Sequence, residues 1–156
     1  MPRQSIQSFL EGRTLVSQAS NVSVRQAALL MAEHSIGAVP VLQGDRLVGI
    51  FSERDLLVRV VAGGLNPDST TLDQVMTREP QTISAQDTLY DALEIMQTGG
   101  FRHLPVMSGE RVSGMLSTRD VPLDVVLRRH KFYAARTWRP SEYPLPYRES
   151  PTSVGD

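Results

Sequence analysis

The chain contains no cysteine among its 156 residues, which excludes disulfide bonds, a thiol nucleophile and a zinc site built on thiolates. Its only lysine is Lys131, and the residues around it do not resemble a phosphate-binding P-loop. The three histidines, His34, His103 and His130, have no zinc-ligand spacing and give no basis for a Ser-His-Asp triad. We therefore expect a protein that is not an enzyme and that needs no metal for its structure.

A surplus of charge of one sign is also missing, because the formal net charge is −1. The bulk of the surface is therefore not suited to a polyanion such as nucleic acid. No apolar run approaches the ~18 residues that a membrane span needs, and the N-terminus lacks the apolar core of a signal peptide. We expect a soluble, cytoplasmic protein that contacts no membrane.

The most informative feature that is present is an internal repeat. The segment GIFSERD at 49–55 returns as GMLSTRD at 114–120, an offset of 65 residues. Between 40–55 and 105–120, eight of 16 residues are identical without a gap. This period is longer than those of solenoid repeats and indicates a duplicated small domain. Because each half alone buries little surface, the two halves should share a core.

Hydrophobic periodicity predicts the same order of elements, β-α-β-β-α, in both halves. We place repeat one at 5–62, a linker at 63–70, repeat two at 71–125 and a C-terminal extension at 126–156. The elements expected in repeat one are a strand at 15–17, a helix at 24–32, strands at 36–42 and 47–51, and a helix at 53–62. Those expected in repeat two are a strand at 82–83, a helix at 89–97, strands at 103–107 and 112–116, and a further helix.

Two interpretations fit the repeated Ser-x-x-Asp. Ser52 with Asp55, and Ser117 with Asp120, can each form a capping box as a strand passes into a helix. The same geometry suits a nucleotide. Free N–H groups at a helix N-terminus attract phosphate, and a carboxylate can accept hydrogen bonds from the two hydroxyls of a ribose. The spacing alone does not separate the two roles.

The combination of motifs resembles a tandem pair of CBS domains, the regulatory modules named after cystathionine β-synthase. The resemblance rests on IGAVPV at 36–41, FRHLPV at 101–106 and Gly-x-x-Ser-x-x-Asp after the third strand of each half. It covers about residues 5–125. It implies an α/β fold of two pseudo-twofold-related β-α-β-β-α repeats packed sheet to sheet.

The resemblance also implies two clefts between the repeats, each combining the Ser-x-x-Asp of one repeat with strand residues of the other. Cleft A would contain Ser52, Asp55, Thr82, Arg102, His103 and Leu104. Cleft B would contain Ser117, Asp120, Ser17, Gly37, Ala38 and Val39. Each Asp would bind ribose hydroxyls, while Arg102 and His103 would face phosphate in cleft A. We expect cleft B to bind less well, because Pro122 interrupts the following helix and Gly37-Ala38 carry no charge.

The function that follows is a regulatory sensor for an adenosine nucleotide, with AMP or ATP favoured and ADP, NAD or S-adenosylmethionine also carrying the required group. Such a protein would sense the energy state and report it to an unidentified target protein. We expect a homodimer, because similar modules pair through their helices and the apolar side chains Leu56, Leu57, Val60 and Val61 should be exposed.

The C-terminal extension has no counterpart in the first half. It carries five of the nine aromatic residues, and its segment 128–139 contains five basic residues and no acidic one. We expect helix up to about Thr137 and none beyond, because prolines follow. An ordered segment docked on a partner subunit is favoured over a single-stranded nucleic-acid site.

Two functions from other classes remain open at this stage. The first is a structural dimerisation module whose clefts bind nothing. The second is nucleic-acid binding through the basic and aromatic residues of the extension. Nucleotide binding separates the sensor from the first alternative, and salt-dependent binding of oligonucleotides would reveal the second.

Overall fold

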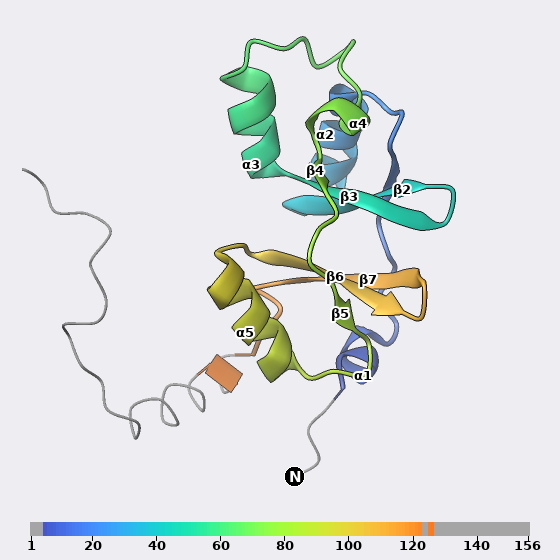
Figure 1. The fold of residues 1–156 in the computed structure, drawn as a ribbon, viewed down its shortest axis with the longest axis vertical. Coiled ribbons are helices and arrows are strands. Elements are labelled where there is room, and N and C mark those ends of the chain that lie inside the picture. Colours follow the sequence, from blue (N-terminus) through green and yellow to red (C-terminus); the bar gives the residue numbers. More distant parts are fainter. Residues whose placement is uncertain (1–4, 123–124, 127–156) are drawn as a thin grey trace, which may run out of the picture. The chain divides into compact units, whose positions relative to one another are not determined.

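A computed structural model describes residues 5–122 and 125–126 (Figure 1). The first element of the described residues is α1 (Ile6–Leu10), which lies before the first strand of repeat one. The first repeat contains β1 (Gln18–Ala19), α2 (Val24–Glu33), β2 (Ala38–Gln43), β3 (Arg46–Ser52), α3 (Glu53–Asp55) and the π-helical segment η1 (Leu56–Val61). After the linker come α4 (Leu72–Val75), β4 (Thr77–Arg78), β5 (Ile83–Ser84), α5 (Leu89–Gly99), β6 (His103–Ser108) and β7 (Arg111–Ser117).

Within residues 5–122, the strands form two sheets, of four and three strands. The first has the order β1-β2-β3-β4, with β1 parallel to β2 and the other pairs antiparallel. The second has the order β5-β6-β7, again with a parallel first pair. The two sheets lie next to each other, with α2 and α5 on their outer sides (Figure 1). The fold is therefore the expected pair of α/β repeats packed sheet to sheet.

The duplication extends to the irregularities of the backbone. The central hairpin of each sheet has a register shift at equivalent positions, Val41/Leu42 and Val106/Met107. Gly44 and Gly109 occupy the hairpin turns with φ of 63° in both, a conformation that glycine adopts without steric cost. The helices α2 and α5 begin with capping boxes, Ser23 with Gln26 and Thr88 with Asp91.

The two short helices α1 and α4 are exchanged between the repeats. Helix α4 follows the linker but packs on repeat one, where the Leu72 amide donates to the Val22 carbonyl at 3.0 Å. Helix α1 comes before the first strand of repeat one but packs on repeat two, where the Ile6 amide donates to the Asp87 carbonyl at 2.9 Å. Ile6 and Leu72 are both fully buried. The exchange follows from burial, because each repeat alone leaves an apolar site open at this position.

The core of repeat one is a cluster of buried aliphatic side chains around Phe51. Alternation along the strands brings its members inward, and α2 and η1 each contribute an apolar face. The cluster consists of Val24, Ala27, Met31, Val39, Val41, Phe51, Val60, Leu72, Val75 and Met76.

Two expectations need correction, for the first strand and for the exposure of Val60. The first strand is Gln18–Ala19 rather than 15–17, because only these residues pair with β2. The segment 71–78, which lies in the predicted repeat two, contributes β4 to the sheet of repeat one. In the helix after Asp55, Val60 is buried, whereas Leu57 and Val61 are 62% and 66% exposed. The expectations for 127–156, including the helix to Thr137, lie outside the described residues.

Chain geometry after the second Ser-x-x-Asp differs from that after the first. A helix begins directly after Ser52, whereas residues 118–120 form a turn after Ser117. Pro122 follows the turn, and a proline at this position cannot donate the hydrogen bond that a continuing helix needs. Within the described residues, no helix has the length and apolar character to cross a membrane.

We predict that Gly49→Ala destabilises the protein more than Gly114→Ala. A Cβ at Gly49 would lie 2.5 Å from Met76 Sδ and 2.9 Å from the Thr77 carbonyl oxygen, which is backbone and cannot rotate away. A Cβ at Gly114 would overlap only the flexible side chain of Leu10. Urea unfolding should show a loss of about 1–3 kcal/mol for Gly49→Ala and less for Gly114→Ala. Equal losses would contradict this account of the packing.

Candidate functional site

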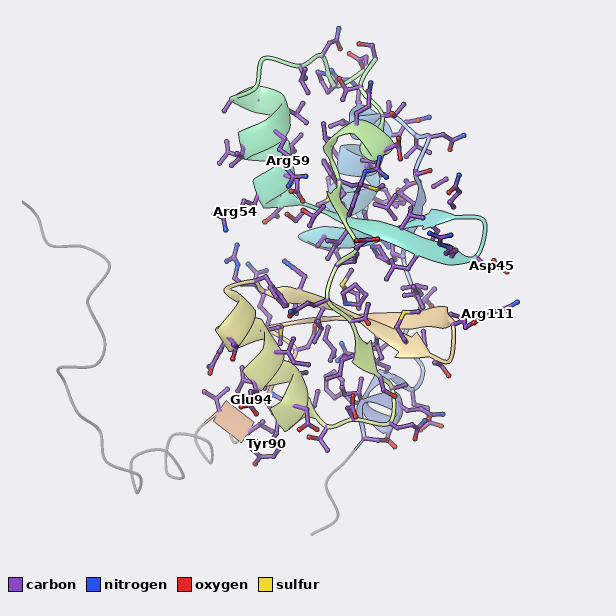
Figure 2. All side chains as sticks on the ribbon, viewed as in Figure 1. Asp45, Arg54, Arg59, Tyr90, Glu94 and Arg111 are labelled. Atoms are coloured by element: carbon purple, nitrogen blue, oxygen red, sulfur yellow. The ribbon has the colours of Figure 1, made fainter. Side chains whose placement is uncertain are left out.

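Two clefts lie where the repeats meet, and the larger, cleft A, contains the first Ser-x-x-Asp. Cleft A has a volume of about 490 Å³ and takes Ser52 and Asp55 from repeat one and Arg102 and His103 from repeat two. Its apolar wall contains Ile50, Val58 and Phe101. It also holds Arg54 and Arg59, which project from the helical segment that begins at Glu53 (Figure 2). The cleft thus combines a carboxylate, cations and an apolar surface.

Asp55 is buried, and both of its carboxylate oxygens have partners. Oδ2 accepts hydrogen bonds from the Ser52 amide and from Ser52 Oγ, both at 2.9 Å. Oδ1 accepts one from Thr77 Oγ1 at 3.2 Å and lies 3.6 Å from Arg59 Nε. Arg59 is further fixed by hydrogen bonds from its Nη1 to the carbonyls of Val75 and Met76. The capping box is therefore present, and it orients the carboxylate inside the cleft.

Cleft B contains the second Ser-x-x-Asp and has a volume of about 380 Å³. Ser117 and Asp120 come from repeat two, and Gly37 and Ala38 come from repeat one. The segment that leads from α1 into β1, which we call the entry segment (residues 11–17), contributes residues 13–16 to the remaining wall. The apolar residues of cleft B are Leu10, Leu15, Val16, Ile36 and Met115, and its cationic residues are Arg13, Arg102 and Arg119.

The Oδ2 atom of Asp120 has the same kind of partners as Oδ2 of Asp55, whereas the Oδ1 atoms of the two residues have different partners. Oδ2 accepts hydrogen bonds from the Ser117 amide at 2.7 Å and from Ser117 Oγ at 2.8 Å. Oδ1 accepts one from Arg13 Nη1 at 2.7 Å. Burial alone would raise the pKa of Asp120, but the hydrogen bonds from Arg13 and Ser117 outweigh it and lower the pKa below its usual value. The carboxylate is therefore ionised at neutral pH.

The two clefts share a wall formed by Gly37, Glu53, Arg102 and His103. A Cβ on Gly37 would lie 3.2 Å from His103 Nε2 and 3.3 Å from Glu53 Oε2, so the glycine makes room for both side chains. Burial lowers the pKa of His103, and the charge of Arg102 lowers it further, while Glu53 and Asp120 act in the opposite direction.

Most of the sequence-predicted site residues line their cleft, and four do not. Leu104 and Val39 are fully buried in the cores of their repeats, because strand alternation turns them away from their cleft-lining neighbours His103 and Ala38. Thr82 and Ser17 also lie outside the linings, since the clefts are bounded further upstream, at 80–81 and 13–16. Ser52, Asp55, Arg102, His103, Ser117, Asp120, Gly37 and Ala38 line the predicted clefts.

Cleft B contains more positive charge than the prediction from Gly37 and Ala38 took into account. Gly37 and Ala38 carry no charge themselves, but Arg13 and Arg119 line the same cleft, and the shared wall adds Arg102 and His103. Sequence reasoning missed Arg13 and Thr77 because neither belongs to the repeated motif. Arg59 had a detectable signal, because it lies four residues after Asp55 on a predicted helix, where the two side chains meet.

The ion pairs that the described residues form away from the clefts are exposed. Asp45 and Arg111 lie at the turns of the two central hairpins, with 3.3 Å between Asp45 Oδ2 and Arg111 Nη2 (Figure 2). Both side chains are about four-fifths exposed, so the pair stabilises the fold little. Within the described residues, no group of three or more His, Asp or Glu side chains could hold a metal ion.

The chain matches known proteins in both repeats. The model of the CBS domain matches twice, at 19–62 and 72–121. A CBS domain-containing protein of Arabidopsis thaliana is 39% identical over 93 residues, which are 60% of this chain but only 16% of that protein.

Solved structures cover more of the chain. A CBS-domain containing protein of Agrobacterium tumefaciens is 32% identical with a TM-score of 0.69, over 81% of this chain and 99% of the other. A CBS domain protein of Pyrobaculum aerophilum, solved in complex with AMP, is 25% identical with a TM-score of 0.73, over 82% and 99%.

We predict that His103 makes stability depend on pH just below neutrality. Its pKa in the folded protein lies below the unfolded value of 6.5, so the unfolded chain binds the proton more readily. The contribution of neutral His103 to the free energy of unfolding should be fully present above pH 6.5. It should be lost as the pH decreases through the pKa that His103 has in the folded protein. His103→Gln should remove this component from urea unfolding curves measured between pH 7.5 and about 5. An unchanged pH profile in the variant would show that other groups cause the loss.

Proposed function

We propose that this chain, which belongs to the CBS-domain family and carries two copies of the domain, is a regulatory module that binds an adenosine nucleotide in its clefts. The observation that carries the proposal is the fixed carboxylate in cleft A. Ser52 orients Asp55 through two hydrogen bonds to Oδ2, so Oδ1 is the oxygen that can receive the hydroxyls of a ribose. The Pyrobaculum protein with the same fold was solved with AMP, which contains this sugar.

The rest of cleft A provides for the other parts of a nucleotide. Arg102 and Arg54 are exposed cations on its wall, and an arginine fork matches phosphate oxygens. Phe101, Ile50 and Val58 offer apolar surface for the adenine ring. The volume of about 490 Å³ lies within the range of small-molecule sites. AMP and ATP are the ligands that we favour, and no catalytic step is part of the proposal.

We propose cleft A as the stronger site. Asp120 in cleft B is already bound by Arg13 at 2.7 Å, whereas Asp55 Oδ1 has a neutral hydroxyl and a more distant arginine. The turn at 118–120 also replaces the helix that follows Ser52 in cleft A, which removes a set of oriented N–H groups. Binding would be reported to a target protein by way of the surfaces around the clefts.

We predict that Asp55→Ala abolishes most of the AMP and ATP binding of cleft A. In wild type, ligand at about 100 times its dissociation constant should raise the melting temperature by about 5–10 °C. Asp55→Ala should lose most of this shift, and a 2′-deoxy ligand should bind more weakly because a hydrogen bond to the carboxylate is lost. Asp120→Ala should lose less.

Asp91→Ala is the matched control, because Asp91 forms the same capping box with Thr88 at α5 and lines neither cleft. It should cost about 1 kcal/mol of stability, as a lost cap does, and leave the ligand-induced shift intact. If no nucleotide shifts the melting curve of wild type, the protein is a structural module instead. If Asp91→Ala and Asp55→Ala reduce the shift equally, the carboxylate acts only as a cap.

We also propose a homodimer that covers the apolar face of η1. Leu57 and Val61 are 62% and 66% exposed one turn apart on this helix, and a second copy offers the same face. Such a self-complementary patch forms a closed pair about a twofold axis. We predict a mass of about twice 17.3 kDa by light scattering, reduced to one copy by Leu57→Glu. A monomeric wild type at micromolar concentration would refute the dimer.

A further inference from the structure

We propose that Arg13 is an intramolecular competitor for the ligand of cleft B, so that a nucleotide enters this cleft only by displacing Arg13 from Asp120. We call the Arg13–Asp120 pair the latch. The inference rests on the proposed nucleotide binding and concerns its regulation, because opening the latch would free the entry segment from repeat two. Cleft B would then report its occupancy through the N-terminal part of the chain.

The carboxylate of Asp120 has one oxygen available for a ligand, and Arg13 occupies it. Ser117 uses Oδ2 twice, through its amide and its hydroxyl. Oδ1 receives the Arg13 Nη1 hydrogen bond at 2.7 Å, a distance typical of a charge-assisted bond. A ribose diol would need this same oxygen, so nucleotide and Arg13 compete directly.

One further contact holds Arg13 itself, and another holds the end of α1 that precedes it. Its guanidinium carbon lies 4.2 Å from the centre of the Phe9 ring, a cation–π arrangement. Leu10 fills the space that Gly114 leaves open on β7. The entry segment therefore lies along cleft B, fixed by α1 at one end and by β1 at the other.

In cleft A the arginine next to Asp55 Oδ1 is Arg59, 3.6 Å away on the helical segment that Asp55 itself belongs to. Within the described residues, no arginine from the segment between α4 and β5 is paired with Asp55, and the exchanged helices explain this difference.

Gln7 of α1 and Asp73 of α4 occupy equivalent positions in the two repeats. The Gln7 amide donates to the Ala85 carbonyl and the Asp73 amide to the Ser20 carbonyl, and these two acceptors are separated by the 65 residues of the internal repeat. Asp73 binds the arginine that follows α4, with 2.9 Å between its Oδ1 and Arg78 Nη2.

On α1 the matching position carries an uncharged residue. Gln7 instead accepts a hydrogen bond from Gln86 Nε2 at 2.6 Å. No carboxylate on α1 thus competes for Arg13, and Arg13 binds Asp120 instead. In cleft A, Asp55 instead accepts a hydrogen bond from a neutral donor, Thr77, which lies between α4 and β5.

The latch is weak enough to open. The Arg13 side chain is 48% exposed and that of Asp120 is 24% exposed, so water screens the pair. A pair of this kind should lower the affinity for a competing ligand about two- to fivefold. Arg102 and Arg119 also line cleft B and can meet the phosphate of the entering nucleotide without Arg13.

The decisive comparison is between Asp55→Asn and the double variant Asp55→Asn/Arg13→Gln, because cleft B then holds the only intact motif carboxylate. Calorimetric titration with AMP should show cleft B binding about two- to fivefold tighter in the double variant. The matched control is Asp55→Asn/Arg25→Gln, which removes an arginine from the exposed pair Arg25–Asp68 outside both clefts. This control should bind like Asp55→Asn alone.

Unchanged binding after Arg13→Gln would overturn the latch, and weaker binding would show that Arg13 is a ligand contact. The same titrations distinguish an error in the latch from an error in the proposed function. Arg13→Gln with an intact Asp55 should still bind AMP in cleft A if only the latch is wrong, whereas absence of AMP binding in every variant, wild type included, would refute both proposals.

A label on the entry segment tests displacement itself. Because the chain has no cysteine, Glu11→Cys gives a single thiol for a fluorophore, on a residue that is exposed and lines neither cleft. AMP binding to cleft B should lower the anisotropy of the label as the segment is released, and Arg13→Gln should lower it before AMP is added. Constant anisotropy during a titration that fills cleft B would overturn the proposal.

Discussion

The rest of the structure depends on one constraint, the burial of Ile6 and Leu72. Each side chain is buried in the repeat opposite to the one that its neighbours in the sequence form. Both side chains are fully buried, and both helices are tied by backbone hydrogen bonds to the repeat that receives them. Because the two helices cross in opposite directions, neither repeat is complete alone. The chain that enters β1 and β5 must therefore pass along the boundary between the repeats, where it forms part of each cleft wall.

Much of the fold and the centre of each site could be predicted from the sequence, because both depend on local patterns. The 65-residue repeat aligns Ser52 with Ser117 and Asp55 with Asp120, and the capping geometry follows from this spacing. Val39 and Leu104 were misplaced because consecutive residues of a strand face opposite ways. Arg13 could not be found, since its partner is 107 positions away and no periodic pattern links distant charges.

The two repeats are alike in backbone and unlike in charge at the boundary they share. Repeat two contributes Arg102 and His103 to this wall, whereas the equivalent residues of repeat one, Gly37 and Ala38, have little or no side chain. Because Gly37 and Ala38 are small, Arg102 and His103 can occupy the space between the repeats, which large side chains from both repeats could not share. Glu53 adds a negative charge that faces His103 across Gly37. A duplicated backbone thereby holds two sites of different character.

The shared wall has a thermodynamic consequence. Arg102 and His103 face both clefts, so an anion in cleft A lowers the electrostatic potential that an anion in cleft B would meet. Such a change in affinity is a coupling free energy, and linkage requires it to be reciprocal. Whatever factor one occupant imposes on the affinity of the second site, the second occupant imposes the same factor on the first.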